Sequence, residues 1–215
     1  GVYIQNVKQM QVGGLVNINQ GNTFRNIVNG INVQRTKNVT YSSTVGLYNN
    51  NFANMKFNYA VSPALNDSAI IALSGNFLGS AIYSEGWYDK LLTVNVDNTM
   101  ADPPVRILNC DIGIASKNAN MNISNCDIEI TTLGIVSNSY GNVDYNIHDN
   151  LINKVHIGIG QYGNIASTQI QNNWINTRDT QMIATFTNAV TYKSPIGIDI
   201  NHGLYEYDPT GGFYN

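Results

Sequence analysis

The chain has 215 residues, a formal net charge of −3 and only 12% charged residues, about half the usual share of roughly 25%. This balance provides no basic field for nucleic acid or an anionic membrane, and no run of apolar residues is long enough to span a bilayer. Asparagine (34 residues) and glycine (19 residues) are abundant, and both disfavour helix interiors while favouring tight turns. The composition therefore predicts an all-β protein rather than a helical or disordered one.

A six-residue motif recurs along the chain: an aliphatic residue, a spacer, small polar turn-formers and another apolar residue. A looser copy occupies 18–24, and the regular copies occupy 47–52, 107–112, 123–128, 147–152 and 170–175. The fourth motif position holds Asn50, Cys110, Cys126, Asn150 and Asn173. Asparagine tolerates left-handed backbone geometry and can form amide ladders, so the motif predicts short strands around a stacked turn.

A second element, a Gly-Ile or Gly-Val pair, opens a strand at a fixed distance after the first motif. The pairs occupy 1–2, 30–31, 113–114, 134–135, 158–159 and 197–198. A repeat that holds only short strands and turns cannot bury its apolar face alone, so successive copies must stack. Strands of a β-sandwich, the other architecture with many short strands, have no reason to share such a motif.

These repeats resemble the parallel β-helix repeats of the pectate-lyase-like superfamily, which includes polysaccharide lyases, glycoside hydrolases, phage tailspikes and surface adhesins. The resemblance implies a right-handed parallel β-helix over residues 1–215 as a single domain, with irregular loops around 61–104 and 177–196. A strand-like segment begins at residue 1 without a preceding cap. We therefore expect a segment of a longer secreted or cell-surface protein, with further domains or a partner covering the N-terminal end.

If the motifs at 107 and 123 occupied adjacent turns, Asp111 and Asp127 would lie about 5 Å apart at the backbone. Such a pair could act as catalytic acids or hold a Ca²⁺ ion, the one cofactor that the sequence suggests. Trp174 falls in the same outward column and could stack on a sugar ring. The alternative is that both aspartates form ordinary side-chain hydrogen bonds in turns, and that Trp174 packs under the following segment.

The segment with Glu85, Trp87, Tyr88 and Asp89 combines two acids and two aromatic residues in the least regular region. This composition suits a ligand-binding loop, although a packed structural loop would look the same. The two cysteines, Cys110 and Cys126, could form one disulfide or remain two small buried thiols. The sequence predicts no dedicated metal site.

The first functional hypothesis is a non-catalytic solenoid segment that serves as an adhesin, a stalk or a glycan-binding surface, with a polysaccharide or surface glycan as partner. The catalytic signatures of polygalacturonase-like relatives are missing, and Arg106 is the one arginine close in sequence to Asp111 and Asp127. The alternatives are a polysaccharide lyase or glycoside hydrolase that uses these two aspartates, and a tailspike-like trimeric fibre.

Overall fold

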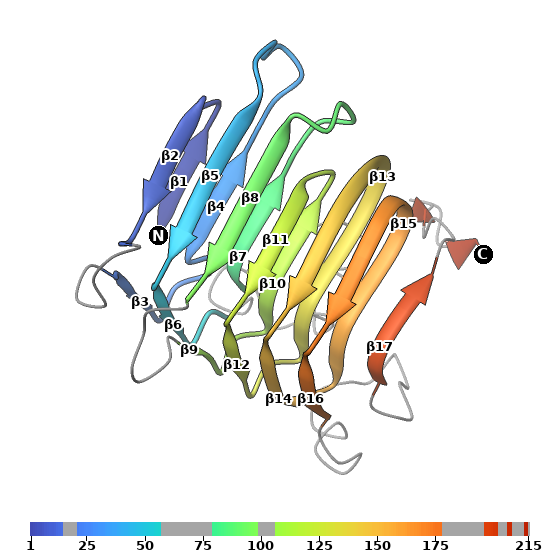
Figure 1. The fold of residues 1–215 in the computed structure, drawn as a ribbon. Coiled ribbons are helices and arrows are strands. Elements are labelled where there is room, and N and C mark those ends of the chain that lie inside the picture. Colours follow the sequence, from blue (N-terminus) through green and yellow to red (C-terminus); the bar gives the residue numbers. More distant parts are fainter. Residues whose placement is uncertain are drawn as a thin grey trace.

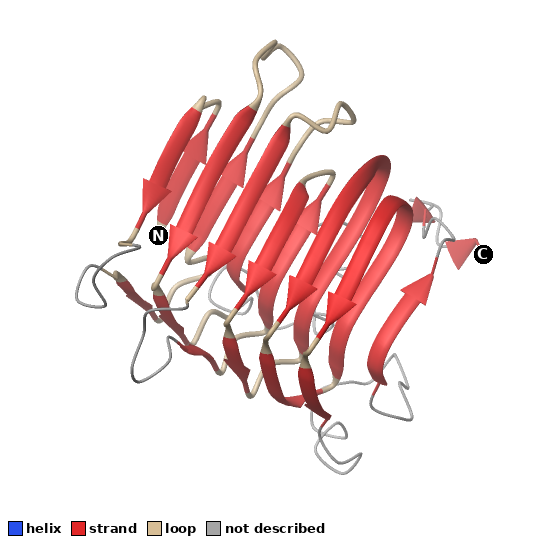
Figure 2. Ribbon diagram, in the orientation of Figure 1, coloured by secondary structure: helices blue, strands red, loops and turns tan. Residues whose placement is uncertain are grey.

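The computed structural model describes residues 1–14, 21–56, 79–98, 106–177, 196–201, 206–207 and 213–214. Within these residues the chain is all-β and has no helix (Figure 2). One short pair, β18 (Glu206–Tyr207) with β19 (Phe213–Tyr214), is antiparallel, and the other pairings in this part of the chain are parallel. The prediction of an all-β protein with parallel strands is confirmed.

The strands form three rows, which we call the first, second and third faces (Figure 1). The first face contains β1 (Val2–Gln5), β4 (Ile31–Gln34), β7 (Ser80–Glu85), β10 (Ile112–Lys117) and β17 (Ile196–Asn201). The second face contains β2 (Gln9–Val12), β5 (Ser43–Tyr48), β8 (Leu92–Asp97) and β11 (Asn120–Ser124). The third face contains β3 (Thr23–Arg25), β6 (Asn51–Ala53), β9 (Arg106–Leu108), β12 (Asp127–Glu129), β14 (Leu151–Val155) and β16 (Trp174–Thr177).

Two long strands, β13 (Leu133–His148) and β15 (Ile157–Gln171), run through both the first and second faces. They join these faces into one strongly curled eleven-stranded sheet, while the third face is a separate six-stranded sheet. The chain visits the three faces in order and then returns beside its previous pass, so that β1 pairs with β4, β4 with β7 and β7 with β10. This arrangement is compatible with a solenoid. We call each pass around the three faces a rung.

The core consists of apolar columns, one from each face, because the pairing register stacks equivalent inward residues. The column of the first face is Val2, Ile31, Ile82, Ile114, Ile135, Ile159 and Ile198. The column of the second face includes Val12, Leu47, Val96, Ile123, Ile147 and Ile170. The column of the third face is Phe24, Phe52, Ile107, Ile128, Ile152 and Ile175. The repeated aliphatic positions of the sequence are therefore the interior of the stack.

The glycines of the Gly-Ile pairs are needed for close approach between rungs. A Cβ atom on Gly134 would lie 2.5 Å from the carbonyl oxygen of Gly158 and 2.9 Å from a methyl carbon of Ile152. Gly113 is equally tight, with 2.4 Å to the carbonyl oxygen of Gly134. A side chain at either position would force adjacent rungs apart or push the third-face isoleucine aside.

An asparagine ladder connects the rungs at the corner between the second and third faces. The Cys126 backbone N–H donates to Asn150 Oδ1 at 3.0 Å, and the Asn150 backbone N–H donates to Asn173 Oδ1 at 3.1 Å. Asn50 occupies the equivalent corner between β5 and β6 and accepts a hydrogen bond from the Asn22 backbone N–H. The predicted asparagine turn therefore exists, but Cys110 is not part of it because it lies between β9 and β10, at a different corner.

The structure corrects the prediction of irregular loops over 61–104 in part. Residues 80–85 and 92–97 are the regular strands β7 and β8, and Ala81 takes the place of the expected glycine before the column residue Ile82. Residues 79, 86–91 and 98 of that range are also described, whereas residues 61–78 and 99–104 lie outside the described residues. Residues 178–195 of the other predicted irregular range lie outside them as well. Cys110 and Cys126 are both buried free thiols, which is the second of the two alternatives left open.

Candidate functional site

Residues 86–91 connect β7 to β8 at the corner between the first and second faces (Figure 1). An aromatic cluster lies at this corner. The ring centroids of Trp87 and Tyr88 are 4.8 Å apart in an edge-to-face contact, and Tyr88 meets Tyr140 in the same way at 6.4 Å. Trp87 is 38% exposed and Tyr88 is 52% exposed. We call Trp87, Tyr88 and Tyr140 the aromatic corner. Large aromatic side chains that remain open to solvent at one place are uncommon unless they meet a partner.

A buried arginine fixes the backbone of the aromatic corner. Both carboxylate oxygens of Asp89 accept hydrogen bonds from Arg35 Nη1, at 2.8 and 2.6 Å. The remaining guanidinium nitrogens of Arg35 donate to the carbonyl oxygens of Tyr41 and Val39. The Arg35 side chain is fully buried, so it ties the β4–β5 and β7–β8 connections together at this corner. A charged group that is buried in this way must be well paired to be tolerated.

The other acid of the predicted loop, Glu85, also has partners within the fold. Glu85 accepts a hydrogen bond from Tyr83 Oη at 2.8 Å and forms an ion pair with Lys117 at 3.1 Å. Burial raises the pKa of the Tyr83 hydroxyl, and the neighbouring Glu85 carboxylate raises it further. Of the four residues predicted for ligand binding here, Trp87 and Tyr88 are therefore open to solvent, while Glu85 and Asp89 have structural partners.

Two lysines lie over aromatic rings near the corner. The Lys37 ammonium lies 5.6 Å from the centroid of the Trp87 ring, and the Lys8 ammonium lies 5.7 Å from that of Tyr41. Both distances fall within the range of a cation–π contact. These contacts favour a fixed orientation of the rings before any ligand arrives.

The predicted acid pair is not brought together by a stacked register. Asp127 pairs in register with Arg106 on β9 and Leu151 on β14, whereas Asp111 lies at the corner before β10. Each acid has its own cation: Asp127 with Arg106 at 3.0 Å and Asp111 with Lys56 at 3.2 Å. The expectation that both aspartates share one outward column on adjacent turns was wrong, because motifs 107–112 and 123–128 have similar sequences but form different corners.

Asp127 is 6% exposed although it lies on the outer side of the third face. Burial raises the pKa of its carboxyl group, and the ion pair with Arg106 opposes that rise. The side chain is thus held by a neighbouring cation rather than presented to solvent. This geometry favours a structural role for Asp127, while its predicted catalytic role remains a prediction.

Trp174 is the most exposed of the large apolar residues in the described part of the chain, at 71%. It begins β16 and pairs in register with Leu151, which is 41% exposed. The outward column that the sequence predicted therefore contains Asn51, Asp127, Leu151 and Trp174, with Arg106 in the place expected for Asp111. Trp174 belongs to the third face and is not part of the aromatic corner.

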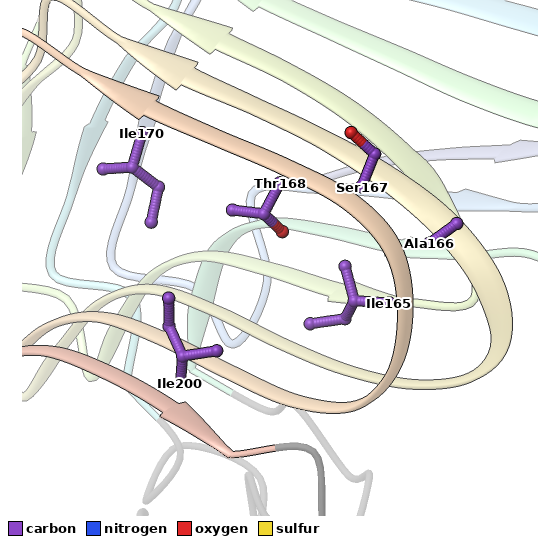
Figure 3. Close-up of a pocket in the computed structure, with 6 residues that line it drawn as sticks. All are labelled: Ile165, Ala166, Ser167, Thr168, Ile170 and Ile200. Carbon is purple, nitrogen blue, oxygen red and sulfur yellow. The ribbon is translucent and has the colours of Figure 1, made fainter.

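An apolar pocket opens at the end of the described stack, beside β17 (Figure 3). It has a volume of about 320 Å³ and is lined by Ile165, Ala166, Ser167, Thr168, Ile170 and Ile200. None of these side chains titrates near neutral pH. The pocket is an opening of the core between β15 and β17 and contains none of the predicted site residues, so it offers no acid–base chemistry.

Across the described ranges, no group of three or more His, Cys, Asp and Glu side chains is placed to hold a metal ion. No helix in that part of the chain is long and apolar enough to cross a membrane. No family model, curated protein or solved structure gives a significant match to this chain. The function must therefore be argued from the geometry alone.

Several residues of the corner could not be identified from the sequence. Tyr140 reaches Tyr88 from the bend of β13, and Arg35 reaches Asp89 across 54 positions of the chain. A single sequence carries no signal for such contacts until the register of every rung is known. The regular spacing of the Gly-Ile pairs could have supplied that register, but the pair is broken at Ala81.

Proposed function

We propose that this chain is part of a right-handed parallel β-helix of the pectate-lyase-like kind, within a secreted or cell-surface protein. The three-face order and the Gly-Ile columns support the helix. Right-handedness follows from the general rule that crossover connections between parallel strands of one sheet are right-handed in almost every known case. A crystal structure with left-handed crossovers would contradict this assignment.

We further propose that the protein binds glycans at the aromatic corner without cleaving them. The observation that carries this proposal is the exposure of Trp87 and Tyr88 on a connection held rigid by the buried Arg35–Asp89 pair. Sugar rings have apolar C–H faces bordered by hydroxyl groups, and exposed aromatic rings on a rigid scaffold suit such faces. A rigid site also loses less entropy when it binds.

The hydrolase or lyase alternative has weaker support in the geometry. A glycoside hydrolase needs two carboxyl groups that flank one glycosidic bond. Asp111 lies at the corner before β10 whereas Asp127 lies on the third face, and each is paired with a basic side chain. The substitutions Asp111→Asn and Asp127→Asn would decide the question, because loss of polysaccharide cleavage in folded variants would establish catalysis.

The test of glycan binding is a glycan array followed by titration of the best ligand against Trp87→Ala and Tyr88→Ala. We expect each variant to weaken binding at least tenfold, because each removes one wall of the cluster. Trp174→Ala is the matched control, since it removes an equally large and more exposed indole from a different face. We expect its affinity to equal that of the wild type.

Two results would reject the proposal. If the wild type retains no glycan on the array, the protein is not a glycan-binding segment of this kind. If Trp174→Ala abolishes binding while Trp87→Ala does not, the glycan site lies on the third face and the aromatic corner has another role. Thermal unfolding of each variant excludes a trivial loss of fold.

A further inference from the structure

The three faces differ in what they present to solvent. On the first face the outward residues Ala115, Val136 and Tyr162 are buried in a second apolar cluster. The third face is narrow and carries the ion pairs of Asp127 and Glu129. The outward residues of the second face are mostly exposed or half-buried along its strands, so a ligand can reach this face.

Outward residues of the second face form columns that consist mainly of uncharged hydrogen-bonding side chains. One column consists of Gln11, Gly46, Asn95, Asn122, Asn146 and Gln169. Its neighbour consists of Gln9, Thr44, Thr93, Asn120, Asp144 and Ser167. Adjacent rungs of a parallel sheet are about 4.8 Å apart, so donors and acceptors repeat at that interval along the stack.

The amides of these columns are held in fixed orientations by their neighbours. Asn122 Nδ2 donates to Asn95 Oδ1 at 2.6 Å, and Asn120 Oδ1 accepts from the Asp144 backbone N–H at 3.0 Å. An amide has two N–H groups and two carbonyl lone pairs, so each side chain keeps hydrogen-bonding capacity for a ligand after these contacts. The ordering entropy of the side chains is thus largely lost before binding.

An aromatic ring lies on the same surface. A Cβ atom on Gly46 would lie 2.4 to 2.6 Å from Cε2, Cζ and Oη of Tyr48, so the Tyr48 ring covers the position that a larger residue would fill. Glycine at this position therefore allows the Tyr48 ring to pack over the Gly46 backbone. The second face combines a flat-lying ring with ordered amides, which is a suitable composition for a sugar chain.

Charge defines the class of ligand. The ionisable residues at the outward strand positions of the second face are Asp97, Asp144 and His148. No lysine or arginine occupies such a position. An acidic polysaccharide would meet no strand-borne cation on this surface and would be repelled by the aspartates. A neutral chain would exchange its water contacts for amide and hydroxyl contacts without such a penalty.

We propose that the second face binds a neutral polysaccharide chain extended along the stack, with the sugar hydroxyls paired to the Asn and Gln columns and one ring on Tyr48. This inference rests on the proposed glycan-binding function and specifies the ligand class and its track. The track borders the aromatic corner, because residues 86–91 of that corner lead directly into β8.

The test is affinity electrophoresis of the full chain in gels that contain a neutral polysaccharide, with xylan, mannan and a soluble β-glucan as probes, and polygalacturonate as the acidic probe. The double variant Asn95→Ala/Asn122→Ala removes the amide pair of the second face. Its matched control is Asn153→Ala/Asn176→Ala, which removes a similar amide pair, with Nδ2 to Oδ1 at 2.9 Å, from the third face. Tyr48→Ala is an independent second variant, and thermal unfolding monitors the fold of each protein.

We expect at least one neutral probe to retard the wild type, and at least tenfold weaker retardation in the Asn95/Asn122 and Tyr48 variants but not in the Asn153/Asn176 control. Equal retardation of all these variants, with loss only in Trp87→Ala, would overturn the track and leave the aromatic corner as the whole site. Stronger retardation by polygalacturonate than by every neutral probe would overturn the ligand class. Absence of retardation by every probe, in a protein that binds a glycan on the array, would reject the track but not the proposed function. Absence of binding in both experiments would reject both.

Discussion

The chain changes direction at the corner between the first and second faces and again at the corner between the second and third faces, and these two corners differ in structure. The corner between the second and third faces is two residues long in four of the rungs, and there its asparagines link one rung to the next. The corner between the first and second faces varies in length. It is longest in residues 35–42, and β13 and β15 pass through it without a break. Among the described residues, exposed aromatic side chains that contact one another occur at the corner between the first and second faces.

The difference shows how a stacked fold separates stability from recognition. Where a corner is only two residues long and its side chains hydrogen-bond to the neighbouring rungs, an insertion would disturb these contacts. A corner that projects from the stack can vary, because its connection contributes little to the core. Binding residues are therefore expected at the variable corner and on the open face beside it.

The largest expected effect comes from breaking the fixed corner with Asn150→Ala. Asn150 is 2% exposed, donates to the Ile123 carbonyl at 3.1 Å and accepts from the Cys126 N–H at 3.0 Å. Leaving such buried backbone groups unpaired costs about 1–3 kcal/mol for each, so we expect a total loss of roughly 3 kcal/mol in urea unfolding. Asn176→Ala, an exposed amide, should change stability by less than about 0.5 kcal/mol. Similar losses in both variants would mean that the ladder has no special role.

The next largest effect should follow removal of the buried cation at the variable corner. Arg35→Met deprives Asp89 and two backbone carbonyls of their partner, and we expect a loss of about 2 kcal/mol. Because Arg35 holds the connection that carries Trp87, quenching of tryptophan fluorescence by acrylamide should also increase. Lys154→Met, which removes an exposed ion pair with Glu129, should cost less than about 1 kcal/mol and leave quenching unchanged. Unchanged quenching in Arg35→Met would show that the corner is rigid without its arginine.

A gain in stability is expected from a substitution at the third corner, which joins each third-face strand to the next strand of the first face. Asn26, Asn54 and Asn109 adopt positive φ there, and Ile130 does so at 55° in the same place. A left-handed conformation costs a branched residue about 1–2 kcal/mol, so Ile130→Asn should stabilise the protein by about 1 kcal/mol in urea unfolding. Lys154→Asn is the control, because Lys154 has φ 54° but no branch at Cβ, and should gain less. A loss of stability in Ile130→Asn would show that packing of the isoleucine outweighs its strain.

The smallest expected effect is on the pH dependence of stability and comes from the carboxyl group of Asp127, next to the asparagine ladder. Burial raises the pKa of Asp127 in the folded protein, so the folded state holds the proton more tightly than the unfolded state does. Stability contributed by this group is therefore present at low pH and is lost as pH rises from the unfolded value through the folded one. In paired urea titrations, the free energy of unfolding of Asp127→Asn minus that of the wild type should therefore be larger at pH 7 than at pH 3. The exposed Asp144→Asn controls for loss of a negative charge, and an identical pH trend in both variants would contradict the prediction.

The fold was largely predictable because the repeat itself encodes it. The Gly-Ile pairs at 113, 134 and 158 are stacked in register as expected, since each glycine accommodates a carbonyl oxygen of the next rung. The rung containing β7 was missed because Ala81 replaces the glycine and the preceding repeat is interrupted. A single altered residue was enough to hide a regular strand from a motif search.

The site was less predictable, because two of the three corners have similar sequences. Motif 107–112 matches motif 123–128 in sequence, yet it joins the third face to the first, whereas 123–128 joins the second face to the third. That ambiguity placed Asp111 opposite Asp127, where the structure has Arg106. Local patterns specify that a turn occurs, but the number of residues between turns decides which face comes next.

The reactivity of the two buried free thiols can report local opening of the stack. Burial raises the pKa of Cys110 to about 11 and raises that of Cys126 as well, so neither is a reactive thiolate in the closed protein. Cys126 lies within the ladder and Cys110 at the corner before β10. The rate at which an alkylating reagent modifies each thiol therefore measures how often its own corner of the stack separates, without any label being introduced.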